Sequence, residues 1–463
     1  MNQEPLHKPN LPYLVFLCVA STLGGLLWGF DAIVISGTIT PVTEQFQLGS
    51  AMEGFFVSSG LLGAVIGSGL AGWLADRFGR SRNLVFAAVL MWLSALASGW
   101  ANSIELLLFA RWIGGLGVGI SAMVCPLYIS EISPAHLRGR LVTLFQFAIT
   151  FGILVALFNN YGLHQWAAVS TAGEGTFLKW FLVDETWRAM FAAELVPGLI
   201  FLALAVFLPE SPRWLVKAGR NAEAGAILNR IFRNGADVEL SEISRTVAEE
   251  HASEKRFMDV FLPRYRKPLA IAVLLAVFAQ FSGINVVFYY GTAMLEKAGF
   301  EAGSALSGMA VIGFFNMIFT MVAVAFVDKF GRRPLLQIGT LGAIACLSAL
   351  GIFFSGGGNI LIVLMCAFVA CFAFSLGPVK FIFASEIFPT NIRSHAMSIA
   401  ILAMWAADTI VGQFTPTLRD AVGPSWTFII FALIIAPQLF MVWKFMPETA
   451  GRSLEEIENE YSR

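Results

Sequence analysis

Charged residues are rare in the long apolar stretches of this sequence, and two of them, Asp31 and Arg111, suggest proton chemistry. An ionisable side chain at membrane depth costs on the order of 2.5 to 3.5 kcal/mol on insertion scales, so it needs a partner or water-filled surroundings. Each of these two residues can serve as the partner of the other. Because a nearby arginine changes the proton affinity of a carboxylate, small movements of Arg111 would switch the protonation of Asp31. A static pair that only fixes helix packing is the alternative.

Lys380 and Asp408 are two further opposite charges, and they stand inside apolar stretches that neighbour each other along the chain. We expect a buried ion pair between them, because the loss of one partner would leave the other charge buried alone. Two functional alternatives stay open. Either Lys380 binds a carboxylate of a ligand, or Asp408 is a second proton site.

Membrane helices must position these charges. The 463 residues are 57% hydrophobic and 13% charged, and the charged fraction is about half of the roughly 25% found in an average soluble domain. Apolar runs of about 20 residues recur along the chain, and each is long enough to cross roughly 30 Å of hydrocarbon. The sequence therefore predicts an all-α membrane protein with about twelve transmembrane helices. The spans begin near Leu11, Ala51, Leu84, Ile104, Leu141, Arg188, Leu269, Ser304, Leu335, Ile360, His395 and Ser425.

The loops between the spans indicate how the chain lies in the membrane. Loops with several Lys or Arg alternate with loops that hold few, so the positive-inside rule places the basic loops and both termini in the cytoplasm. A long polar stretch separates two sets of six spans, and its segment 221–232 has the apolar spacing of an amphipathic helix. A plain linker is the alternative for this stretch. The predicted domains are a six-helix bundle at 1–208, a cytoplasmic helical linker domain at 209–266, a second six-helix bundle at 267–447 and a short cytoplasmic tail at 448–463.

The two bundles repeat each other in sequence. The loop DRFGR at 76–80 returns as DKFGR at 328–332, and PES at 209–211 returns as PET at 447–449. Matched signatures in register indicate a duplication. A duplicated bundle predicts a substrate site near the bilayer midplane between the halves, which is exposed alternately to each side of the membrane.

These residues resemble the sugar porter family of the major facilitator superfamily, and the likeness covers nearly the whole chain. The resemblance implies the major facilitator fold, with two six-helix pseudo-repeat bundles. In proton symporters of this family an aspartate occupies the position of Asp31, whereas passive facilitators typically lack the acid, so the resemblance implies symport. Besides the paired loops, the matching positions are Arg111, Gly114, Gly115, Gly117, Gly119, Pro126, Tyr128, Glu131, the run PESPRWL at 209–215, Gln280, Ser282, Gly283, Ile284, Asn285, Tyr289, Tyr290, Gly377, Pro378, Val379, Ser385, Glu386, Phe388 and Pro389.

The resemblance also implies a cytoplasmic latch. In this family, loop carboxylates and arginines form ion pairs between the two halves and hold the cytoplasmic side shut. Such pairs give a bistable element, because they form in one conformation and separate in the other. The alternative is that the loop charges only set the topology. The latch positions in this chain are Asp76, Arg77, Arg80, Glu131, Arg138, Glu210, Asp328, Arg332, Arg333, Glu386, Arg393 and Glu448.

A sugar site built from amides and aromatic rings is implied in the same way, since these groups suit the hydroxyls and the apolar face of a sugar. Buried amides that only join helices are the alternative. Three positions depart from the family pattern: Ala279 and Met404 replace expected glutamines, and Phe381 replaces the usual tryptophan. We therefore expect a site less polar than one for glucose or xylose. The predicted substrate residues are Gln146, Gln280, Asn285, Tyr290, Asn316, Phe381, Trp405 and Trp28.

Together these features predict a secondary active transporter that moves a monosaccharide or related polyol with a proton by alternating access. The alternatives are a passive sugar facilitator of the same fold and a transporter-like sugar sensor. The expected partners are the sugar, the proton and the lipid bilayer, and the expected unit is a monomer. A net charge of −1 gives no reason to expect nucleic-acid binding, and no nucleophile, metal cluster or phosphate-binding loop suggests an enzyme or a cofactor. The lack of Asn-x-Ser/Thr sites favours a bacterial inner membrane.

Overall fold

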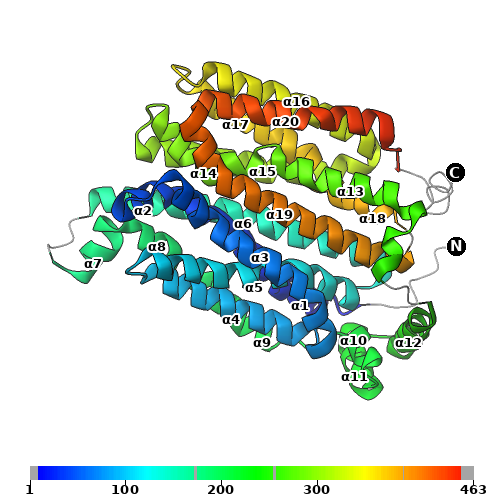
Figure 1. Ribbon diagram of the computed structural model, residues 1–463. Helices are drawn as coiled ribbons and strands as arrows, with labels where there is room; N and C mark the ends of the chain where they lie inside the picture. Colours follow the sequence, from blue (N-terminus) through cyan, green and yellow to red (C-terminus); the bar gives the residue numbers. More distant parts are fainter. Residues whose placement is uncertain (1–8, 171–174, 254–256, 389, 450–463) are drawn as a thin grey trace.

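The computed structural model describes residues 9–170, 175–253, 257–388 and 390–449 of the chain. In these residues, twelve helical segments are long and apolar enough to cross a membrane, which confirms the predicted number of spans. Figure 1 shows long helices packed side by side, with three short helices gathered at one end of the bundle. We call that end the linker side and the opposite end the far side. The three short helices are α10 (Pro212–Lys217), α11 (Asn221–Ile231) and α12 (Ala236–Ser253).

Each half of the molecule contributes six of the spans. The first half consists of α1 (Leu11–Val34), α3 (Ser50–Phe78), α4 (Arg80–Gly99), α5 (Ile104–Ile132), α6 (Ala135–Val169), and a broken span made of α8 (Thr186–Ala192) and α9 (Leu195–Val206). The second half consists of α13 (Pro263–Phe281) with α14 (Ile284–Lys297), α15 (Ala302–Phe330), α16 (Arg332–Phe353), α17 (Ile360–Cys371) with α18 (Gly377–Glu386), α19 (Thr390–Val422) and α20 (Pro424–Phe445). Two short helices, α2 (Ile39–Phe46) and α7 (Phe177–Lys179), lie on the far side (Figure 1).

Several helices begin a few residues before the apolar runs that predict them. Arg80 and Arg332 lie in the first turns of α4 and α16, although the apolar runs begin four and three residues later, near Leu84 and Leu335. A helix end at the membrane boundary carries charged residues that hydropathy alone assigns to the loop. The amphipathic segment predicted in the polar stretch is present as α11, and Ala224, Leu228 and Ile231 form its buried face.

Small residues allow the helices of the first half to approach closely. A Cβ atom on Gly29 of α1 would lie 2.0 Å from the carbonyl oxygen of Ile149 in α6, and one on Gly152 of α6 would lie 2.0 Å from that of Leu26. Only glycine fits at such contacts, and packing through small residues is a usual way for helices to associate in lipid. These contacts fix α1 against α6, which both border the site described below.

Two spans of the second half are interrupted at mid-membrane. The seventh span breaks between α13 and α14 at Gly283, whose φ of +80° is a left-handed conformation that favours glycine. In the tenth span a π turn, Phe372–Leu376, precedes Pro378. Since proline has no backbone N–H to donate, this local widening of the helix fits its presence. Breaks of this kind turn side chains toward the interior of the bundle, where irregular backbone is tolerated in a membrane protein.

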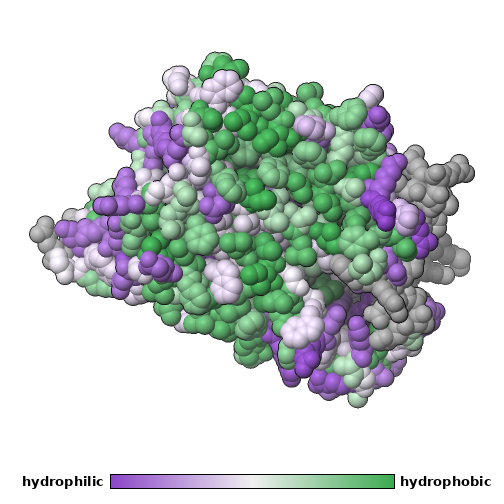
Figure 2. All heavy atoms as spheres, in the orientation of Figure 1, coloured by the Kyte–Doolittle hydropathy of each residue, from purple (hydrophilic) through white to green (hydrophobic). Residues whose placement is uncertain are grey.

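The surface of the bundle suits contact with lipid. The two halves meet mainly along α3 with α19 and along α6 with α15. Large apolar side chains such as Phe207 and Trp443 stand exposed on the outside. Figure 2 shows hydrophobic atoms over the middle of the molecule and hydrophilic atoms gathered at its two ends. A band of this kind is stable in hydrocarbon and would be an unusually large apolar patch in water. The chain is a multi-pass membrane protein.

Candidate functional site

A central cavity of ≈ 150 Å³ lies between the two halves. Its walls come from helices α1 and α6 in the first half and from α13, α14, α15, α18 and α19 in the second. Among the predicted substrate residues, those that line the cavity are Trp28, Gln146, Gln280, Asn285, Asn316, Phe381 and Trp405.

Tyr290 is the predicted substrate residue that the structure places elsewhere. Its side chain is fully buried, and its hydroxyl donates a hydrogen bond to the backbone oxygen of Gly412 in α19. Tyr289 lines the cavity instead. Successive residues of a helix point about 100° apart, so the break at Gly283 decides which of the two tyrosines faces inward. The sequence gives both residues the same type and does not show the rotation of α14.

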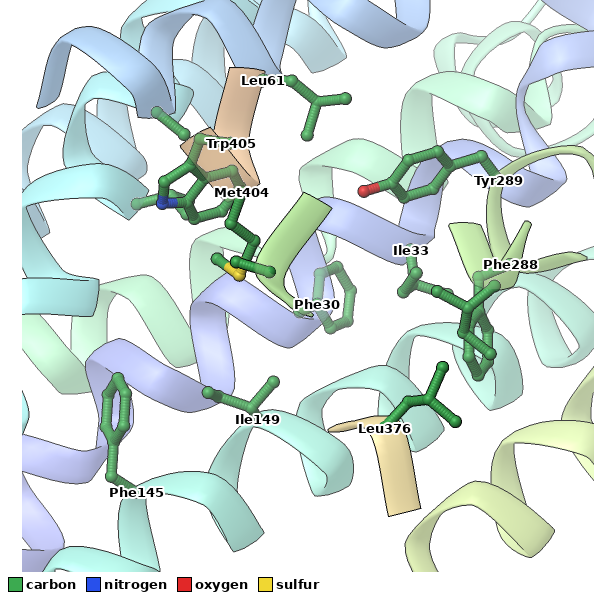
Figure 3. Packing of buried hydrophobic residues seen from close by; sticks show 14 of the residues in the cluster. Phe30, Ile33, Leu61, Phe145, Ile149, Phe288, Tyr289, Leu376, Met404 and Trp405 are labelled. Carbon is green, nitrogen blue, oxygen red and sulfur yellow. The ribbon is translucent and has the colours of Figure 1, made fainter. Parts of the chain in front are cut away.

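Aromatic rings form one wall of the central cavity. The rings of Trp28 and Trp405 lie 5.3 Å apart at 41°, and Phe145 lies 6.2 Å from Trp28 on the other side. Figure 3 shows Trp405, Met404, Tyr289 and other apolar side chains around this space. The buried Nε1 of Trp405 has no hydrogen-bond partner among the described residues. A buried donor without a partner is costly, so this indole is ready to donate to an oxygen of a ligand.

Asp31 and Arg111 form the buried ion pair that the sequence predicts. The side chains come from α1 and α5, and Nη1 of Arg111 donates to Oδ1 of Asp31. Gly60 makes room for the guanidinium, because a Cβ at this position would lie 3.2 Å from Nη2 of Arg111. The ring of Phe191 lies 5.5 Å from the guanidinium carbon. The pair is therefore enclosed by protein.

Glu194 is a third buried charge beside this pair, and our reading of the sequence missed it. It stands at the junction of α8 and α9, where Pro197 in the first turn of α9 prevents a continuous helix. Glu194 lies in electrostatic range of both Asp31 and Arg111, and its Oε1 has no hydrogen-bond partner among the described residues. The available signal was a carboxylate three residues before a proline inside an apolar run.

A side pocket of ≈ 20 Å³ lies beside the central cavity. Asp31 and Arg111 line this side pocket. Trp28, Tyr289 and Trp405 line both spaces, so they form a shared wall. Events in the central cavity therefore reach the ion pair through one layer of aromatic side chains.

Lys380 and Asp408 both line the central cavity, but the predicted ion pair between them is not formed in the described part of the chain. Asp408 accepts hydrogen bonds from the amide of Asn285 and, at 3.2 Å, from the hydroxyl of Tyr289. The ammonium of Lys380 instead lies 5.1 Å from the ring centre of Phe381. The prediction of a bridge is wrong because α14 supplies two donors that satisfy Asp408 first.

The predicted latch residues of the first half pair with one another on the linker side. Arg80 donates to both carboxylate oxygens of Glu131 at 2.9 Å and lies 3.3 Å from Asp76. Glu210 accepts hydrogen bonds from the backbone nitrogen of Arg80 at 2.6 Å and of the next residue at 3.2 Å. Gly79 permits this turn, since its φ is +92° and a Cβ there would collide with the Glu210 carboxylate.

The second half repeats this arrangement. Arg332 donates to Glu386 at 2.8 and 3.1 Å, and Glu448 accepts from the backbone nitrogens of Arg332 and Arg333 at 2.9 and 3.0 Å. Gly331 has a φ of +82° and leaves the same room for the carboxylate. The duplicated sequence motifs therefore fold into duplicated hydrogen-bond networks.

Among the described residues, the predicted latch between the halves is not engaged in this conformation, and it stays a prediction. The ion pairs found among the described latch residues lie within each half, not between the halves. Arg77 stacks over the rings of Trp73 and Phe78, Arg138 is exposed, and Arg393 donates to a backbone oxygen of its own half. The side chain of Asp328 lies outside the described residues. The tight glycine turns aim each arginine at the neighbouring loop of its own bundle, which the sequence pattern does not reveal.

Contacts between the halves gather on the far side. Glu53 at the start of α3 accepts hydrogen bonds from Arg419 near the end of α19, at 2.8 and 3.0 Å. Other bonds join Ser36 to Thr292 at 2.9 Å, Thr40 to Glu296 at 2.6 Å and Ser58 to Gln413 at 2.7 Å. These bonds, and the one from Gln413 to the backbone oxygen of Ala51, join the two halves on the far side. The far side is closed in this conformation.

Known proteins share this architecture and a third or more of the sequence. The chain is 38% identical to the arabinose-proton symporter of Bacillus subtilis (strain 168), with 97% of each chain covered. It is 36% identical to the D-xylose-proton symporter of Escherichia coli (strain K12), with 97% of this chain and 96% of that one covered. The inward open conformation of the xylose transporter XylE from E. coli superposes with a TM-score of 0.81 at 34% identity, covering 97% of this chain and 100% of that chain.

The fold and the cavity define a membrane transporter of the major facilitator type, built from two six-helix bundles around a central site. Within that class the family is specified by the whole chain. The family model described as "Sugar (and other) transporter" matches residues 17–461. The chain belongs to this sugar transporter family.

Proposed function

We propose that this chain is a sugar–proton symporter that carries a monosaccharide or a related polyol by alternating access. The observation that carries the proposal is the wall of Trp28, Tyr289 and Trp405, which the sugar-sized cavity shares with the pocket of the buried Asp31–Arg111 pair. A sugar against this wall touches the side chains that enclose the ion pair. The names of the arabinose and xylose relatives, both proton symporters, support the same proposal.

The sugar binds in the central cavity through amides and aromatic rings. Gln146, Gln280, Asn285 and Asn316 supply donors and acceptors for its hydroxyls. The face of Trp405 packs on the apolar side of the ring, and its unpartnered N–H donates to a sugar oxygen. Lining of mixed polar and aromatic character is typical of small-molecule sites.

The coupling proton binds to Asp31. When the carboxylate takes up the proton it loses its charge, and the charge-assisted bond from Arg111 weakens. Glu194 is the other carboxylate within electrostatic range of Arg111. The guanidinium of Arg111 therefore turns toward Glu194, and the Nε of Arg111, which has no partner among the described residues, gains an acceptor there. Because Asp31, Arg111 and Glu194 stand on α1, α5 and the α8–α9 junction, this exchange biases how these helices pack.

The basic loops place the linker side and both termini in the cytoplasm of a bacterial cell, with the protein in the inner membrane. The conformation described here, closed on the far side, is then the one closed to the outside. The monomer is the transport unit and the lipid bilayer its surroundings. The linker-side ion pairs exchange partners across the halves when that side closes, which gives the latch its two states.

The test is uptake into proteoliposomes of a labelled panel of hexoses, pentoses, inositols and sugar acids, with and without an inward proton gradient. We expect one or a few of these compounds to accumulate above their outside concentration only when the gradient is present, and a protonophore to abolish the accumulation. Equal uptake with and without the gradient would make the protein a passive facilitator. No uptake of any compound in the panel would contradict the proposed substrate class.

A further inference from the structure

Lys380 is a buried cation in the wall of the central cavity. It stands in the first turn of α18, directly after the π turn and Pro378, and only 8% of its surface is exposed. Its side chain lines the central cavity. It also lines a smaller pocket of ≈ 10 Å³, which we call the alanine pocket because Ala272, Ala276, Ala384 and Ala400 lie in its walls.

Asp408 lies in electrostatic range of Lys380, but Lys380 has no direct ion pair among the described residues. Its ammonium lies 5.1 Å from the ring centre of Phe381 and 5.8 Å from that of Phe372, and no ion pair joins it to a carboxylate of the described residues. The only carboxylate that lines the cavity beside it is Asp408, whose oxygens are engaged by Asn285 and Tyr289. Cation–π contacts offset only part of the cost of removing an ammonium from water.

A second lysine shows what the same contacts look like without a site. Lys444 in α20 also lies over two phenylalanine rings, 5.3 Å from that of Phe440 and 5.5 Å from that of Phe445. It is exposed at the end of its helix, and it lines neither the central cavity nor the alanine pocket. Water solvates this ammonium, so it needs no anion. Lys380 also lies over two phenylalanine rings, but it is buried and lines the central cavity.

We propose that Lys380 binds the carboxylate of an acidic monosaccharide, such as a uronic or aldonic acid, and so selects this class over neutral sugars. The inference rests on the proposed function and deepens it. Amides of the cavity, Gln280 and Asn316 among them, bind the hydroxyls, while the carboxylate reaches the ammonium at the border of the alanine pocket. Charge-assisted hydrogen bonds of this kind are roughly twice as strong as neutral ones.

The chemistry of the site favours a carboxylate over a phosphate ester. A single lysine balances one negative charge, whereas a phosphate ester carries nearly two at neutral pH. Asp408, which also lines the cavity, repels any anionic ligand, and it repels a dianion about twice as strongly as a monoanion. Aromatic and aliphatic walls around Lys380 offer no further cation in the described lining. A monocarboxylate therefore matches the site, and a dianion does not.

Matched pairs of sugars test the proposal. Dissociation constants of D-glucuronate and D-glucose, and of D-galacturonate and D-galactose, are measured by calorimetry on the purified full-length protein. We expect each acid to bind about 10- to 100-fold more tightly than its neutral partner, the usual effect of a hydrogen bond to a charged group. Glucose 6-phosphate is the third arm, and we expect it to bind more weakly than glucuronate. Tighter binding of the phosphate would overturn the choice of a carboxylate.

Variants assign the preference to the lysine. Lys380→Gln should lower the ratio of acid to neutral affinity at least tenfold, and Lys380→Arg should keep most of the ratio because it keeps the charge. Lys444→Gln is the matched control and should leave the ratio unchanged. Elution of each variant as a single species in size-exclusion chromatography shows that it is folded, and Lys380→Arg keeps the test decisive where the glutamine variant is not folded.

The failures of the two proposals are distinguishable. If the protein binds and transports neutral sugars with no preference for the acids, and Lys380→Gln leaves the ratio unchanged, this inference is wrong while the proposed function stands. If no neutral or acidic sugar is bound or transported, the proposed function is wrong as well.

Discussion

The two ends of the interface between the halves hold their charges in different ways. On the far side, the buried pair of Glu53 and Arg419 joins α3 of one half to α19 of the other. On the linker side, Arg80 with Glu131 and Arg332 with Glu386 each stay inside one half. Figure 1 shows the two ends at opposite poles of the bundle. This difference indicates that the far-side pair resists separation of the two halves at that end. The linker-side pairs stabilise each bundle and leave the halves free to separate on the linker side.

Arg80→Ala should have the largest effect on stability. The change leaves Glu131, whose side chain is 4% exposed, as a buried charge without its partner. Loss of one partner of a buried pair costs about 3 to 5 kcal/mol, and we expect a destabilisation of that size, measured by thermal unfolding in lipid nanodiscs. Arg77→Ala is the control, because Arg77 lies close by in the last turn of α3 and stacks on exposed rings. An effect no larger than that of the control would show that the pair does not stabilise the bundle.

Glu53→Gln should act on conformation more than on folding. In this variant Arg419 loses the charge of Glu53 and one of its two acceptor oxygens but keeps Asp420 at 2.9 Å, so the cost is smaller, about 2 kcal/mol. It falls only on the state with a closed far side, and it corresponds to a shift of roughly 30-fold toward an open far side. Distances between spin labels on the far-side ends of α3 and α19 measure the shift. Unchanged distance distributions would show that the pair of Glu53 and Arg419 does not hold the far side closed.

Arg332→Ala should cost less than Arg80→Ala, although the two networks repeat each other. The side chain of Glu386 is 25% exposed, against 4% for Glu131, so water stabilises the carboxylate left behind. We expect about 2 kcal/mol, between the values for surface pairs and buried pairs. The comparison uses the same unfolding assay. A cost equal to or above that of Arg80→Ala would show that the exposure of the carboxylate left behind does not determine the cost of losing its arginine.

Lys297→Gln should have the smallest effect. Lys297 and Asp420 form a pair at 3.3 Å on the far side, but both stand in the second half and both side chains are more than 40% exposed. Surface pairs contribute about 0 to 1 kcal/mol, and this pair does not cross the interface. Neither the unfolding temperature nor the far-side distances should change. A shift as large as that of Glu53→Gln would mean that far-side charge in general, and not the cross-half pair, holds this end closed.

The sequence predicts what depends on neighbours along the chain and on repetition. Hydropathy gives the spans, and the repeated DRFGR and DKFGR loops indicate a duplication, which the structure shows as alike networks around Arg80 and Arg332. Asp31 and Arg111 are found because charges in apolar runs need partners.

What the sequence does not give depends on helix rotation and on pairing across long distances. Glu53 and Arg419 are separated by 366 positions, and neither residue type is unusual at a helix end. Tyr289 and Tyr290 differ only in the face of α14 they occupy. The bridge from Lys380 to Asp408 was expected because the two opposite charges stand on spans that neighbour each other along the chain. In the structure, two uncharged donors on α14 bind Asp408.

The most direct test of proton coupling compares Asp31→Asn with the wild type in two modes of transport by the same proteoliposomes. Asparagine keeps the size of the side chain but binds no proton, so the variant should lose accumulation driven by the proton gradient. It should still exchange labelled for unlabelled substrate faster than protein-free liposomes, because exchange needs only a working cavity. Gradient-driven accumulation at the wild-type level in Asp31→Asn would contradict the account and move the proton site elsewhere.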